Sequence, residues 1–162
     1  CRGFEKAYEE GKKLGLDVFF GWEYSYRGTD LLTFGLDKEW LIKHPEVLSY
    51  KIHEYCDFIH SEGGLIIHAH PFREAPYISM IRLLPRKVDA VEIINGGNTE
   101  FQNSCAEKYA DMYNLITVAG SDTHSDRIPM VCGIEVNRRL TGIDDMISAL
   151  KNREFGIFTI SL

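Results

Sequence analysis

The sequence lacks any long apolar run. No apolar segment approaches the ~20 consecutive residues that a membrane-spanning helix needs. A surplus of basic residues is also missing, because 18 Lys and Arg stand against 24 Asp and Glu, which gives a formal net charge of −6 at pH 7. A chain of this sign is poorly suited to the phosphate backbone of nucleic acids. We therefore expect no membrane partner and no nucleic-acid partner, whereas cations remain suitable ligands.

The sequence is also poor in cysteine pairs. Its four cysteines form no Cys-x-x-Cys motif and are widely spaced, at Cys1, Cys56, Cys105 and Cys132. In a chain of 162 residues this usage is typical of reduced thiols rather than of a disulfide framework, so we expect a cytoplasmic protein. The length and the 44% of hydrophobic residues predict a single domain over residues 1–162.

Helical and extended patterns alternate along the chain. Apolar residues at helical spacing predict helices over 3–14, 47–62, 77–84, 99–113 and 143–153. Short apolar or aromatic runs predict strands over 17–26, 31–36, 65–69, 88–95, 115–119, 131–136 and 157–160, with a turn at 27–30. Thr141 with Asp144 resembles a capping box for the last helix. This alternation predicts an α/β fold with a mostly parallel sheet.

Polar residues follow several of the predicted strands. In α/β folds the active site lies at the carboxyl ends of the strands. The residues expected there are Glu23, His68, His70, Glu92, Asn95, Ser121, Asp122 and His124. Imidazole and carboxylate groups are the ligands of Zn, Mn and Fe when three or more converge. The sequence therefore predicts a divalent metal site at this edge of the sheet.

Each of these residues also has a structural interpretation. Glu23 could cap a helix instead of binding a metal. His68 lies inside a buried strand, which favours a core histidine over a ligand. Pro71 favours extended backbone at His70 and ends the strand there. Residues 53, 57 and 60 (His, Asp and His) share a helical face, which we interpret as a solvated surface.

Four segments in this order resemble the PHP (polymerase and histidinol phosphatase) domain family. They are GWEYS, IIHAHPFR, VDAVEIING and AGSDTHS, and the resemblance runs from about residue 3 to the end. It implies a distorted (β/α)₇ barrel with a site of two or three metals that hydrolyses phosphate esters. Glu23 matches the metal-bridging glutamate of the family, His70 matches the histidine of its His-Pro motif, and Asp122 and His124 match its final Asp-x-His pair.

The sequence also departs from the family pattern. The opening Asp-x-His-x-His strand and the following Thr-Asp-His strand have no counterpart. Where the family often has a histidine after the glutamate strand, the segment TDLLTFGLD offers only Asp30 and Asp37. We therefore expect a partial barrel, corresponding to roughly the last five strands. Its open strand edge near residues 17–26 should be covered by the N-terminal helix or by a partner chain, as in a homo-oligomer.

These features predict a metal-dependent phosphoesterase that acts on a small phosphorylated substrate with a metal-activated water. Asp122 would orient the attacking group, and His124 would polarise the leaving oxygen or serve a further metal. Arg73, or more weakly Arg127, could bind a phosphate oxygen, although a surface arginine is an equal interpretation. One alternative is a non-catalytic structural or regulatory module with an incomplete metal site. Another is a metal-dependent hydrolase of the amidohydrolase type.

Overall fold

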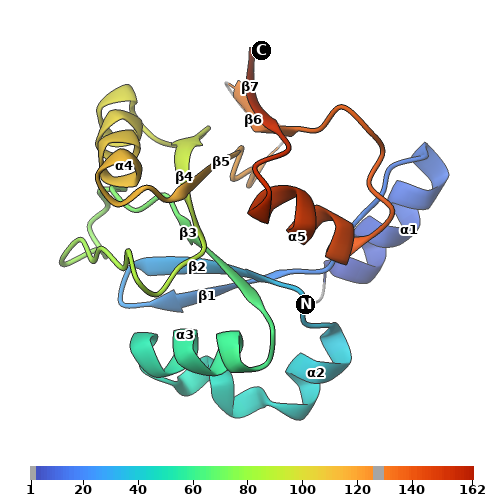
Figure 1. Cartoon of the computed structure of the whole chain (residues 1–162), viewed down its shortest axis with the longest axis horizontal. Coiled ribbons are helices and arrows are strands. Elements are labelled where there is room, and N and C mark those ends of the chain that lie inside the picture. The colour runs from blue at the N-terminus through green and yellow to red at the C-terminus, as the bar shows by residue number, and fades with distance from the viewer. Residues whose placement is uncertain (1–2, 126–129) are drawn as a thin grey trace.

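The computed structural model describes residues 3–125 and 130–162 and contains a central sheet with helices on both faces (Figure 1). The helices are α1 (Phe4–Leu14), α2 (Lys38–Lys43), α3 (Ile52–Ser61), α4 (Glu100–Tyr113) and α5 (Ile143–Lys151), with a short 3₁₀ helix at Pro45–Ser49. The strands are β1 (Trp22–Tyr26), β2 (Thr29–Phe34), β3 (Leu65–Ala69), β4 (Ala90–Asn95), β5 (Ile116–Gly120), β6 (Met130–Glu135) and β7 (Gly156–Ser161).

The main sheet has the strand order β1-β2-β3-β4-β5. β3, β4 and β5 pair in parallel, whereas β2 is antiparallel to both β1 and β3, so only β2 runs against the other four strands. The predicted α/β class is confirmed. Within the described residues β1 and β5 are the edges of this sheet, and β6 and β7 form a separate antiparallel pair, so the predicted barrel is not confirmed.

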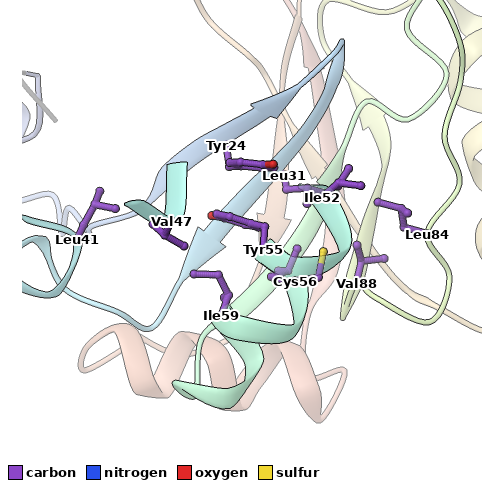
Figure 2. Packing of buried hydrophobic residues seen from close by; sticks show 11 residues of the cluster. Tyr24, Leu31, Leu41, Val47, Ile52, Tyr55, Cys56, Ile59, Leu84 and Val88 are labelled. Atoms are coloured by element: carbon purple, nitrogen blue, oxygen red, sulfur yellow. The ribbon is translucent and has the colours of Figure 1, made fainter. Parts of the chain in front are cut away.

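One face of the sheet packs against α3 in the largest core cluster (Figure 2). The rings of Tyr24 and Tyr55 stack with centroids 3.7 Å apart. The hydroxyl of Tyr55 accepts a hydrogen bond from Trp22 Nε1 at 2.8 Å and shares another with Thr33 Oγ1 at 2.6 Å. Apolar burial and these paired polar groups fix β1 and β2 against α3.

The opposite face of the sheet packs against α5. Leu32 and Ile67 belong to the same core cluster as Met146 and Leu150 of α5, and Figure 1 shows α3 and α5 on opposite sides of β1 and β2. Successive side chains of a strand point to opposite faces. Glu23 is in register with Leu32, which is in register with Ile67, so Glu23 lies on the α5 face. This face carries the candidate site.

Three local predictions are wrong. The expected helix over 77–84 is absent, because Arg82 hydrogen-bonds to the carbonyl of Arg27 and to Thr29 and holds the segment against the β1–β2 turn. The strand expected from residue 17 begins only at Trp22. The expected capping box of α5 does not form, since Asp145 rather than Asp144 accepts hydrogen bonds from Thr141.

The outer edge of β1 has no strand partner among the described residues. α1 packs on the segment before this strand, where Phe4 contacts Phe20 with ring centroids 5.0 Å apart. Coverage of the edge by a partner chain stays a prediction. The described cysteines, which are Cys56, Cys105 and Cys132, are free thiols. No helix in the described ranges is long and apolar enough to span a bilayer.

Candidate metal centre

Three side chains converge on the α5 face, from neighbouring strands. Glu23 lies in β1, Asp30 lies near the start of β2, and His70 directly follows β3. His70 Nε2 is 3.7 Å from Glu23 Oε1 and 3.7 Å from Asp30 Oδ2. The three ligand atoms all lie within 4.8 Å of one another. Because β2 is antiparallel to its neighbours, its beginning lies at the same edge as the end of β3.

The spacing of these atoms fits a shared divalent cation. At 3.7 Å the imidazole nitrogen is too far from either carboxylate for a good hydrogen bond. Two ligands bound to one ion at ~2.1 Å can lie at most ~4.2 Å apart, so 3.7 Å is within reach of a common ion. Two carboxylates and one imidazole also form a donor set that Zn, Mn and Fe accept.

His70 is held by its backbone as well as by its side chain. Its φ of +28° is uncommon for a residue other than glycine, so the extended backbone expected before Pro71 is not observed. Its N–H donates to Glu92 Oε2 at 2.9 Å, and its side chain is only 5% exposed. Burial raises the pKa of Glu92, although hydrogen bonds from Asn95 and His70 oppose the shift. A buried ring with a fixed backbone presents Nε2 in one direction.

Asp122 follows β5 and lies beside this group, but it is paired with an arginine. Its Oδ2 is 2.6 Å from Arg73 Nη1 and 3.9 Å from His70 Nε2. Burial alone would raise the pKa of Asp122, but the hydrogen bond and charge of Arg73 outweigh that effect and hold the pKa below its usual value. Asp122 is therefore an ionised carboxylate at neutral pH.

Arg73 is fixed by amide side chains as well as by Asp122. Its Nη2 donates to Asn95 Oδ1 at 2.7 Å, and its Nε donates to Asn98 Oδ1 at 3.1 Å. Its side chain is 18% exposed, so the interpretation as a free surface arginine is wrong. The sequence pattern does not predict this role for Asn95 and Asn98. Asn95 is the last residue of β4 and Asn98 lies in the loop that follows, so their position at the carboxyl end of a parallel strand is the signal that points to the site.

Two of the predicted ligands lie apart from the converging group. His124 has a side chain that is 83% exposed, and its Nδ1 contacts the carbonyl of Asp122 at 2.9 Å. His68 is in register with Leu31, which is in register with Tyr24, so it lies on the α3 face, opposite Glu23. The His68 ring packs edge-on against Tyr109, and burial lowers its pKa to about 3.

The remaining candidates have other surroundings. Asp37 caps α2 by accepting a hydrogen bond from the N–H of Trp40 at 2.7 Å. His60 and Asp57 lie on α3 and pair with Asp89 and Lys87, away from the centre. Arg127 lies outside the described residues.

A cavity of about 340 Å³ lies over the converging group. It is lined by Glu23, Ser25, Gly28, Asp30, His70, Arg73, Tyr77, Asp122 and His124. Its volume is at the lower end of the ~300–1,000 Å³ typical of ligand sites, which fits a small substrate. Its lining contains the carboxylates of Glu23, Asp30 and Asp122 together with Arg73.

Neither the family models nor the curated proteins include a match to this sequence. Solved structures do match. A two-domain protein from Bacteroides vulgatus that contains a predicted PHP-like metal-dependent phosphoesterase is 17% identical, with a TM-score of 0.69 over 97% of this chain and 49% of that one. PsfC from Pseudomonas syringae is 18% identical, with a TM-score of 0.66 over 91% of this chain and 61% of that one.

A third match is a protein from Bifidobacterium adolescentis whose assignment as a metal-dependent phosphoesterase is provisional. It is 16% identical, with a TM-score of 0.52 over 91% of this chain and 81% of that one. The chain thus has the fold of structures named as metal-dependent phosphoesterases, one of them PHP-like, in agreement with the resemblance seen in its motifs. It spans about half the length of the Bacteroides protein.

Proposed function

We propose that this chain hydrolyses a small phosphate ester with a divalent cation held by Glu23, Asp30 and His70. The convergence of these three ligand atoms in the lining of a cavity carries the proposal. The fold, which is shared with structures named as metal-dependent phosphoesterases, supports it. A bound Zn, Mn or Fe ion would supply Lewis acidity and a nucleophilic water at neutral pH.

The residues of the cavity wall have distinct roles in this proposal. The ionised carboxylate of Asp122 accepts a hydrogen bond from the attacking water and so orients it. The guanidinium of Arg73 faces the same cavity and balances the charge of phosphate oxygens. The doubly protonated ring of His124 would donate from Nδ1 to the carbonyl of Asp122 and would transfer its Nε2 proton to the leaving oxygen, which leaves the ring neutral.

The test is hydrolysis of p-nitrophenyl phosphate by the purified chain supplied in turn with Zn²⁺, Mn²⁺ and Fe²⁺. Asp30→Asn should lose both bound metal and turnover, since it removes a charged ligand. Asp122→Asn should lose turnover and keep bound metal. Asp111→Asn, which removes an exposed carboxylate on α4, is the matched control and should retain both.

Two results would contradict the proposal. Turnover of cyclic amides without turnover of phosphate monoesters would favour the amidohydrolase alternative. Bound metal without turnover of either substrate class would favour a non-catalytic module.

A further inference from the structure

The carboxylates of the site face two different partners. Glu23 and Asp30 lie around His70 Nε2, whereas the nearest cation to Asp122 is Arg73, at 2.6 Å. Asp122 is not a member of the group whose ligand atoms all lie within 4.8 Å. The site is therefore divided into a three-ligand group and a carboxylate–guanidinium pair.

The guanidinium is locked in this position. Asn95 Oδ1 accepts from Arg73 and also from the N–H of Gly97 at 2.8 Å, while the Asn95 amide nitrogen donates to Glu92 at 2.8 Å. Asn95 is only 1% exposed, so its own orientation is fixed. The arginine thus has three partners, which are Asn95 at the end of β4, Asn98 in the loop after β4, and Asp122 after β5. Moving it would leave buried polar groups unpaired, which is costly.

We propose that Arg73 takes the place of a second cation beside Asp122, so that the chain binds one divalent ion and not a pair. This inference rests on the proposed metal site. An arginine keeps its charge at every physiological pH. A second ion bound by Asp122 would lie next to that fixed charge and would be repelled. The expected stoichiometry therefore differs from the two or three metals that the family resemblance implies.

The experiment counts Mn²⁺ bound to the metal-free chain, by elemental analysis after gel filtration and by electron paramagnetic resonance. The native chain should bind one equivalent with the spectrum of an isolated ion. Arg73→Met removes the charge and should bind two equivalents with the spectrum of a coupled pair. Arg73→Lys keeps the charge and should bind one.

Two further variants control for folding and for general charge effects. Arg82→Met removes a nearby arginine that contacts Arg27 and Thr29 rather than the site carboxylates, and it should bind one equivalent. Asp122→Asn leaves Arg73 in place, so its Mn²⁺ affinity should stay within about twofold of the native value, well short of the ~10-fold or larger loss expected for a residue that supports a metal. Loss of metal from Asp122→Asn would overturn the inference even where Arg73→Met fails to fold.

The outcomes separate this inference from the proposed function. Two equivalents in the native chain, or one equivalent in folded Arg73→Met, overturn the inference. Phosphate turnover with two ions bound would overturn it and leave the proposed function standing. One bound ion without turnover would support the inference and contradict the proposed function. A native chain that binds no Mn²⁺ overturns both.

Discussion

The carboxylate of Glu92 accepts the backbone N–H of His70 at 2.9 Å, and so a buried residue of β4 fixes the residue that follows β3. The same Oε2 atom accepts the Asn95 amide at 2.8 Å. Gly120 on β5 makes room for this carboxylate, because a methyl group there would collide with Oε1. Glu92 thus supports both the predicted histidine ligand and the asparagine that holds Arg73.

Two substitutions of Glu92 should show whether its hydrogen-bond acceptor or its negative charge stabilises the fold. In Glu92→Gln the amide oxygen still accepts from His70, so the free energy of unfolding should stay close to the native value. Glu92→Ala leaves two buried donors unpaired and should cost about 1–3 kcal/mol. It should also weaken Mn²⁺ binding by ~10–100-fold, as expected for loss of a group that orients a ligand. Urea unfolding and calorimetric titration measure the two effects, and native values for Glu92→Ala would contradict this role.

The buried His68 should make stability depend on pH. Burial, with a smaller contribution from the charge of His70, lowers its pKa from 6.5 to about 3. Between these values the unfolded chain takes up a proton that the folded chain excludes. The free energy of unfolding should therefore fall as the pH drops below 6.5, with a slope approaching about 1.4 kcal/mol per pH unit.

Urea unfolding between about pH 5 and pH 7, around the ordinary histidine pKa, measures this contribution. His68→Leu should flatten the slope, because an apolar side chain of similar size takes up no proton. His53→Gln, at an exposed position of α3, should keep the native slope and serves as the control. Equal slopes in the native chain and His68→Leu would show that His68 titrates normally in the folded state.

The hydroxyl of Tyr55 should stabilise the α3 face. It accepts from Trp22 Nε1 and bonds to Thr33, which is fully buried. Tyr55→Phe keeps the ring and leaves both partners without this contact, so it should lower the free energy of unfolding by about 1–3 kcal/mol. Tyr77→Phe, at a side chain that is 69% exposed, should change it little. Equal losses in the two variants, measured by urea unfolding, would argue against a specific role for the Tyr55 hydroxyl.

The sequence predicts the parallel part of the fold well because its signals there are local. The buried run of β3, the strand pattern of β4 and the amphipathic α4 appear close to their expected bounds. The segment 77–84 has helical periodicity as well, but Leu84 is its only buried residue. Tyr77, Met80 and Leu83 are exposed, and contacts with the β1–β2 turn decide the conformation instead.

The candidate site was predictable only in part for a similar reason. Glu23 and His70 stand out by residue type and position. Asp30 falls in the predicted turn at 27–30, and its place beside His70 depends on the antiparallel pairing of β2 with β3, which sequence periodicity does not reveal. The pairing of Arg73 with Asp122 depends on side-chain rotamers and on two asparagines that are distant in sequence. Such contacts follow from the assembled fold.

The most direct test of the central claim is an anomalous difference map from crystals of the chain soaked in Mn²⁺. We expect one peak bonded to Glu23, Asp30 and His70, with ligand distances of about 2.0–2.2 Å. A map without a peak at saturating Mn²⁺, or with its peak bonded to other residues, would contradict the assignment of this metal centre.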